Sequence, residues 1–156
     1  MRLWGPAPAA MLLAIIACSR SQPFPIVLGE DGCDHCHMTL TDSRFTAELL
    51  TTTGKGYRFD DIGCLAAFLA DGSVPAEREG RAWVNDYLHP GQWLVAGEAV
   101  YLRSDSLRTP MGSGIIALRA DGPVDSLRAA LAATRLDWAA VRAVGGHGRG
   151  SSGMTP

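Results

Sequence analysis

An apolar run near the N-terminus decides which part of this chain can form a folded domain. Residues 3–17 carry no charged side chain, and Arg2 places a positive charge just before them. The run is shorter than the roughly 20 apolar residues that a helix needs to cross a bilayer. A basic start, a short apolar stretch and a small final residue, here Ala17, are typical of a secretory signal peptide. We therefore expect residues 1–17 to be a signal peptide and the rest of the chain to act outside the cytoplasm.

The residues that end this run also predict a lipid anchor. Residues 15–18 read Ile-Ile-Ala-Cys and resemble the bacterial lipobox, in which the cysteine is lipidated and cleavage falls just before it. The alternative is an ordinary signal peptide, or a buried helix, with an incidental cysteine. Acyl chains on Cys18 would hold the protein on a membrane, because each buried methylene contributes about 0.8 kcal/mol. Ser19 stands in place of the Asp associated with inner-membrane retention, which favours the outer membrane of a Gram-negative cell, with the domain facing the periplasm.

The expected location outside the cytoplasm makes the number of cysteines informative. Cys33, Cys36 and Cys64 remain besides Cys18. Compartments outside the cytoplasm are oxidising, so an odd number of thiols means that at least one is unpaired or binds a ligand.

The net charge is −2 and no run of Lys or Arg occurs, which gives nucleic-acid binding almost no electrostatic support.

Composition divides the processed chain into three parts. Residues 18–30, which include Pro23 and Pro25, are expected to form a lipid-anchored tether, and residues 31–144 the folded domain. Residues 145–156 are rich in Gly and Ser and are expected to be disordered. Hydrophobic residues make up 47% of the chain, which is enough to give the middle part a core.

The domain is expected to contain two successive passes of strand, strand and helix. In the first pass, residues 44–52 alternate apolar and polar side chains as a half-buried strand does, and residues 57–59 begin the return strand. A helix capped by Asp60 or Asp61 then extends to about Ala70.

The second pass contains strand-like segments at residues 82–87, 99–103 and 114–119. A helix opens after Gly122-Pro123, and a short last helix covers residues 138–144. Together the two passes predict an α+β domain in which sheets pack against segregated helices.

The densest group of reactive side chains lies in residues 33–38, Cys-Asp-His-Cys-His-Met. Copper(I) is a soft ion that prefers such sulfur donors, whereas calcium and magnesium prefer oxygen. In an extended segment, Cys36 and Met38 would share one face, and His35 and His37 would share the other. These residues therefore predict a metal site, with Cys36 and Met38 as the first candidates.

Two alternatives remain open for the same segment. Cys33 and Cys36 can instead form a disulfide that tightens a loop. They can also form a thioredoxin-like redox pair, although that motif should open a helix after a strand and no clear strand pattern precedes it.

Two further sulfur-containing side chains are less informative by themselves. Met111 lies in the loop-like stretch 109–114, Thr-Pro-Met-Gly-Ser-Gly, where a gap-filling methionine is the simpler interpretation. Cys64 lies at the edge of the apolar stripe of the first helix. We interpret it as a small buried hydrophobe and not as a ligand.

Taken in this order, the motifs resemble those of the NosL family, copper-binding lipoproteins that help assemble nitrous oxide reductase. The resemblance covers nearly the whole domain. It is carried by Cys18, Cys33-x-x-Cys36-x-Met38, Phe59-Asp60-Asp61-Ile62-Gly63-Cys64, Trp83-Val84-Asn85-Asp86-Tyr87, Trp93, Ala99-Val100-Tyr101 and Thr109-Pro110-Met111-Gly112-Ser113-Gly114.

The resemblance implies a pair of ββα units, related in fold to a domain of alkylmercury lyase, and a copper(I) chaperone that is not an enzyme. By position, it implies Cys36, Met38 and Met111 as copper(I) ligands, so Met111 becomes a candidate after all. His37 and Cys33 are weaker candidates. The implied partners are the nitrous oxide reductase apoprotein and an ABC-type transporter complex.

Two other classes of function stay open at this point. A structural zinc module would use Cys33, Cys36 and two of His35, His37 and Cys64 in a closed tetrahedral site. A thiol-based lyase or oxidoreductase would use Cys36 and Cys64 with Asp60 or Asp61, but the sequence shows no evident activated nucleophile.

Overall fold

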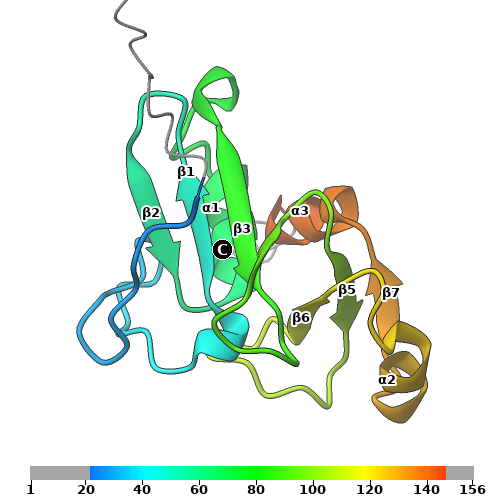
Figure 1. Ribbon diagram of the computed structural model, residues 1–156. Helices are drawn as coiled ribbons and strands as arrows, with labels where there is room; N and C mark the ends of the chain where they lie inside the picture. Colours follow the sequence, from blue (N-terminus) through cyan, green and yellow to red (C-terminus); the bar gives the residue numbers. More distant parts are fainter. Residues whose placement is uncertain (1–21, 147–156) are drawn as a thin grey trace, which may run out of the picture.

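The computed structural model describes residues 22–146, in which seven strands form two antiparallel sheets beside three α-helices (Figure 1). The first sheet contains, in spatial order, β2 (Gly56–Phe59), β1 (Ala47–Leu50), β3 (Arg81–Asn85) and β4 (Trp93–Val95). The second contains β6 (Ile115–Leu118), β5 (Val100–Arg103) and β7 (Thr134–Leu136). The helices are α1 (Ile62–Ala70), α2 (Val124–Ala130) and α3 (Trp138–Gly146), and two 3-10 turns are η1 (Ser43–Phe45) and η2 (Ala76–Arg78). The predicted lipidation site Cys18 and all but the first two residues of the predicted tail lie outside the described residues.

The predicted α+β class is confirmed. Each sheet contributes two of its strands to one ββα unit. The first unit is β1-β2-α1 and the second is β5-β6-α2. β1 is shorter than the predicted strand 44–52, because η1 occupies its first residues. The side chain of Asp42 starts this turn by accepting a hydrogen bond from the Arg44 amide at 3.0 Å.

Helix α1 begins as the sequence predicts and covers part of the first sheet. Its N-cap is Asp61, whose side chain accepts a hydrogen bond from the Gly63 amide at 2.6 Å. The ring of Phe68 then packs against Tyr57 and Phe59 of β2, with ring centroids 4.8 and 5.1 Å away. The end of β2 and the start of α1 are therefore held in one fixed arrangement.

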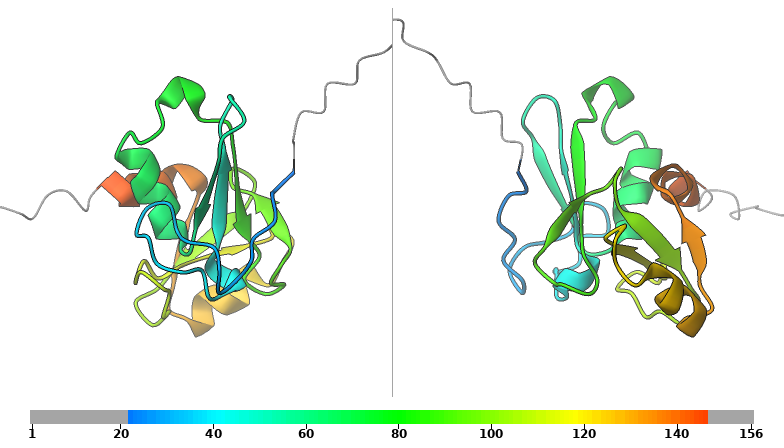
Figure 2. Two further views of the ribbon diagram at one scale, coloured as in Figure 1. Left: turned by 90° about the vertical axis from the view of Figure 1, so that its left-hand side faces the viewer. Right: turned by 45° about the vertical axis from the view of Figure 1, so that its right-hand side comes forward.

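Helix α3 joins the two halves of the molecule. It lies beside α1 (Figure 2), and a Cβ on Gly145 would collide with the main chain of Ala66. On the other side, the ring of Trp138 stacks on Tyr101 of β5 at 5.9 Å. Gly145 and Gly146, which the sequence places in the tail, are thus the last residues of a packed helix.

One predicted placement is wrong: residues 82–87 do not belong to the second unit. They contribute β3, which pairs antiparallel with β1 of the first sheet. Trp83 and Val84 point to opposite faces, yet each is at most 3% exposed, as in a central strand covered on both sides. The apolar pattern alone predicts such a strand but does not identify the neighbour with which it pairs. Strands β4 and β7 were not predicted, because three residues show no periodicity.

The segment before residue 31 also contacts the domain. The Phe24 amide donates to the carboxylate of Glu48 at 3.0 Å, and the Arg58 guanidinium donates to the Pro25 carbonyl at 3.1 Å. Part of the predicted tether therefore lies along the first sheet. Among residues 22–146, no helix is both long and apolar enough to cross a membrane.

Candidate metal centre

The first half of the centre is a tight loop at residues 31–40. Gly32 and Thr39 form an isolated antiparallel bridge across it. Inside this bridge the Cys33 amide donates to the Met38 carbonyl at 2.8 Å, and the His37 amide donates to the Cys33 carbonyl at 2.9 Å. The segment is a closed turn, so the extended conformation considered above does not occur.

Asp34 fastens this loop to β2. Its carboxylate accepts a hydrogen bond from the Arg58 amide at 2.6 Å, and its own amide donates to the Arg58 carbonyl at 2.8 Å. This pair of bonds places the loop beside the end of β2, where Phe59 is followed by Asp60. The loop is held by main-chain geometry as well as by side-chain packing.

Three thiols and one carboxylate meet where the loop touches α1. The ligand atoms of Cys33, Cys36, Asp60 and Cys64 all lie within 4.8 Å of one another. Cys33, Asp60 and Cys64 are buried, and Cys36 is partly exposed. The loop supplies Cys33 and Cys36, and the first turn of α1 supplies Cys64. All three cysteines are free thiols, so the disulfide considered for Cys33 and Cys36 is not formed.

The thiols differ strongly in acidity. A hydrogen bond from the Cys64 thiol lowers the pKa of Cys33 to about 6. The same hydrogen bond raises the pKa of Cys64 far above its ordinary value, and burial acts in the same direction. Burial is the main cause that raises the pKa of Cys36 to about 11. Cys33 is therefore the most acidic of the three thiols.

Asp60 has one carboxylate oxygen that suits a cation. Its Oδ1 accepts a hydrogen bond from the Cys36 thiol at 3.4 Å. Its Oδ2 is buried and has no hydrogen-bond partner among the described residues. A buried carboxylate oxygen without a partner is costly, and a positive ion among the sulfurs would remove that cost. The donor set therefore fits a thiophilic metal ion.

The loop that carries Met111 is bound to the neighbouring residue, Asp61. The Met111 amide donates to Asp61 Oδ2 at 3.0 Å, and the Ser113 hydroxyl donates to Oδ1 of the same carboxylate. A Cβ on Gly63 would collide with Ser113, which shows how closely the loop approaches the start of α1. This loop and the loop of residues 31–40 lie toward the same end of the domain (Figure 2).

The two methionines are on the surface. Met38 is 53% exposed and Met111 is 47% exposed, so neither thioether is part of the core. The gap-filling interpretation of Met111 is therefore wrong. Each methionine belongs to a loop that contacts the Asp60-Asp61 pair or the thiols beside it.

The histidines do not join the thiol cluster. His37 is exposed, and its φ of +62° places it in the left-handed region that few residues other than glycine adopt. The Nδ1 atom of His35 lies 3.9 Å from the carboxylate of Asp71, at the end of α1. Sequence reasoning left out Cys64, although its position in the first turn after Asp60-Asp61 and the odd cysteine count were both available signals.

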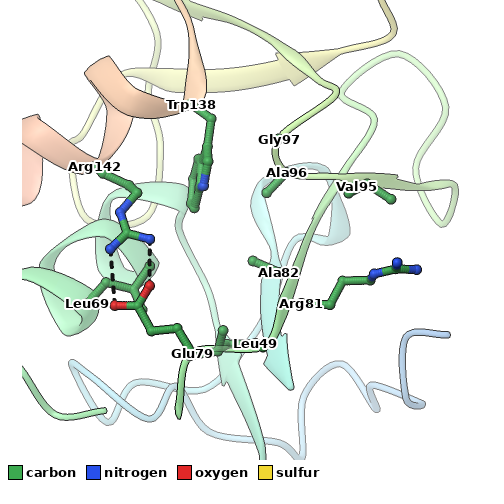
Figure 3. A pocket seen from close by; sticks show the side chains of 11 residues that line it. Leu49, Leu69, Glu79, Arg81, Ala82, Val95, Ala96, Gly97, Trp138 and Arg142 are labelled. Carbon is green, nitrogen blue, oxygen red and sulfur yellow. Dashed lines mark hydrogen bonds and ion pairs between the residues drawn. The ribbon is translucent and has the colours of Figure 1, made fainter. Parts of the chain in front are cut away.

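A separate cavity of about 230 Å³ lies away from this cluster (Figure 3). Its walls include Leu49, Trp138 and the ion pair in which Arg142 donates to Glu79 at 2.6 and 3.0 Å. None of the thiols or methionines lines it. The cavity is therefore not part of the metal centre.

The fold and the cluster define a small α+β domain whose three thiols and one carboxylate fit a metal ion. No protein-family model matches the sequence, and no curated protein matches it either. The fold is similar to the crystal structure of the copper chaperone NosL from Shewanella denitrificans, with a TM-score of 0.64 over 74% of this chain and 92% of that chain. The two sequences are 18% identical, and the comparison establishes a NosL-like fold.

Proposed function

We propose that this protein is a copper(I) chaperone of the cell envelope, anchored by a lipid on Cys18 and facing the periplasm, at the outer membrane if the cell is Gram-negative. It delivers copper for the maturation of nitrous oxide reductase, and an ABC-type transporter complex is its second partner. The proposal draws on the NosL-like fold, on the signal peptide and lipobox predicted from the sequence, and on the three thiols that meet beside α1.

One observation carries the assignment of the ligands. Asp60 contacts the Cys36 sulfur at 3.4 Å, and the next residue, Asp61, binds the Met111 amide at 3.0 Å. Two loops that are far apart in sequence therefore meet on two adjacent residues. Met38 follows Cys36 in the same closed turn. We propose Cys36, Met38 and Met111 as the ligands through which copper enters and leaves.

These ligands suit delivery better than storage. Copper(I) is soft and accepts thiolate and thioether donors. An ion held by two or three such ligands on the surface can leave by exchange with an incoming sulfur or imidazole, because a free coordination position is open to the partner. The thioethers of Met38 and Met111 cannot form disulfides, so they keep their affinity in an oxidising compartment.

A competition titration tests the assignment. Under reducing conditions, a chelator specific for copper(I) should report one ion per molecule. Cys36→Ser should weaken binding at least tenfold, and Met38→Leu and Met111→Leu should each weaken it measurably. Unchanged affinity in all three variants would rule out the assignment. Delivery is tested by mixing the loaded protein with nitrous oxide reductase apoprotein and following the appearance of its copper centres.

A structural zinc site is the second candidate, because the cluster contains four potential donors. Cys33, Cys36, Cys64 and Asp60 have the number and type of ligands that a closed tetrahedral site needs. A structural zinc ion should be required for folding, whereas an empty chaperone should remain folded. Thermal unfolding of the metal-free protein separates the two functions.

A further inference from the structure

We propose that the copper ion has two positions in this domain. The outer position is the one above, with Cys36, Met38 and Met111, and the inner position is formed by the sulfurs of Cys33, Cys36 and Cys64. Cys36 belongs to both positions, so the ion can pass between them without leaving the protein. This inference rests on the proposed function, which assigns the cargo.

The distances between the thiols support the inner position. A metal–sulfur bond of about 2.3 Å places three sulfurs in a plane around one ion roughly 4.0 Å apart. The three sulfurs lie at most 4.8 Å apart, so small side-chain rotations bring them to this separation. Their main chains need not move: the turn bond from Cys33 to Met38 and the helix bond from the Cys64 amide to the Asp61 carbonyl hold both elements.

The exposure of the ligand residues decreases from the outer position to the inner one. Met38 and Met111 are about half exposed, Cys36 is partly exposed, and Cys33 and Cys64 are only 2% and 3% exposed. A partner can reach the outer ligands and cannot reach the inner pair. The inner position therefore retains the ion, and the outer position presents it.

The unpartnered oxygen of Asp60 is the second observation that points to a cation. Asp60 Oδ2 is buried beside the thiols and has no hydrogen-bond partner among the described residues. The negative potential of this oxygen favours a positive ion among the three sulfurs. Copper stays in the +1 state throughout. Each thiol that binds as a thiolate releases its proton to the surrounding water as the copper–sulfur bond forms.

A double variant, Met38→Leu with Met111→Leu, isolates the inner position. Both side chains are on the surface, so the fold should be preserved. The variant keeps Cys33, Cys36 and Cys64 as the sulfur ligands among the described residues. X-ray absorption of the processed chain with one equivalent of copper(I) should then show three sulfur neighbours. Loss of copper, or a single sulfur neighbour, would overturn the inner position and leave the outer one in place.

Cys64→Ser and Cys64→Ala complete the test. In the double-variant background, each should lower the sulfur count from three to two and weaken copper(I) binding at least tenfold. The same substitution in the otherwise unchanged protein should spare the outer position and leave two thioethers and one thiolate on the ion. If the Cys64 variants weaken zinc binding and leave copper(I) binding unchanged, the inner site is not a copper site. Failure of Cys36→Ser to affect copper would instead contradict the proposed function itself.

Discussion

The main-chain amide of Met111 donates a hydrogen bond to the carboxylate of Asp61 at 3.0 Å, across fifty residues of chain. The other oxygen of this carboxylate caps α1 through the Gly63 amide and accepts the Ser113 hydroxyl. One buried side chain therefore determines both where the helix begins and where the methionine loop lies.

Asp61→Ala should weaken the fold and the metal site together. We expect a loss of about 3 kcal/mol in the free energy of unfolding, since a lost cap costs about 1 kcal/mol and further hydrogen bonds to a charged group add roughly 1.5–3. Copper(I) affinity should also fall, because the Met111 loop is released. Denaturant unfolding and chelator competition measure the two effects. Asp121→Ala is the control, since Asp121 is on the surface and pairs with Arg119. Equal effects of the two substitutions would contradict this role of Asp61.

Oxidation should remove copper binding from the empty protein. The three thiols lie within 4.8 Å, so diamide, which accepts the two hydrogens, should join two of them in a disulfide. The count of free thiols among Cys33, Cys36 and Cys64 should fall from three to one, and dithiothreitol should restore both thiols and copper binding. Protein loaded with copper(I) should resist the same treatment. Rapid oxidation of the loaded protein at all three positions would show that these sulfurs do not hold the ion.

His37→Gly should stabilise the domain by about 1 kcal/mol. His37 has a φ of +62°, and this left-handed conformation costs a residue with a Cβ roughly 1–2 kcal/mol. Copper(I) affinity should stay within twofold, because the exposed imidazole lies outside the thiol cluster. His37→Asn is the matched variant, since asparagine tolerates this conformation and also removes the imidazole. A large loss of affinity in both variants would identify His37 as a ligand.

The free energy of unfolding should decrease as the pH rises, because Glu48 titrates. This carboxyl is fully buried in β1, and burial raises its pKa to about 7, against the opposing effects of the Phe24 amide and Arg58. Between about pH 4.5 and 7 the folded state keeps the proton and the unfolded state releases it, so unfolding becomes easier with rising pH. A difference of one in pKa between the folded and unfolded states corresponds to about 1.4 kcal/mol, and we expect the free energy of unfolding to decrease by about 2 kcal/mol by pH 8.

Glu48→Gln should remove most of this pH dependence, because the amide does not titrate and can still accept the Phe24 amide hydrogen bond. Denaturant unfolding at several pH values gives the slope for each variant. Glu98→Gln provides the comparison, since Glu98 is exposed. A slope that is unchanged in Glu48→Gln would assign the effect to another group.

Local signals predicted the parts of the structure that depend on neighbouring residues. Asp61 followed by an apolar stripe predicted α1 and its cap. Gly54, with a φ of +86°, lies in the turn between the two strands predicted at residues 44–52 and 57–59. The pairing of β3 with β1 depends on which strand lies nearby in three dimensions, and no single segment contains that information.

The candidate metal centre was also predicted only in part. Residues 33–38 indicated a metal site by their composition alone. Cys64 did not, because a buried thiol in a helix has the same sequence signal whether it faces a core or other thiols. What distinguishes the two cases is the fold of the 31–40 loop, which is fixed by the hydrogen bonds between Asp34 and Arg58.

The hydrogen bonds between Asp34 and Arg58 also have a consequence for the proposed cycle of metal loading and release. Because they brace the cysteine loop against β2 before any ion arrives, loading copper orders little additional chain, and unloading disorders little. In the proposed function, copper(I) affinity would then come from the copper–sulfur bonds, with little contribution from coupled folding. For the proposed chaperone, the binding loop would then stay intact from one delivery to the next.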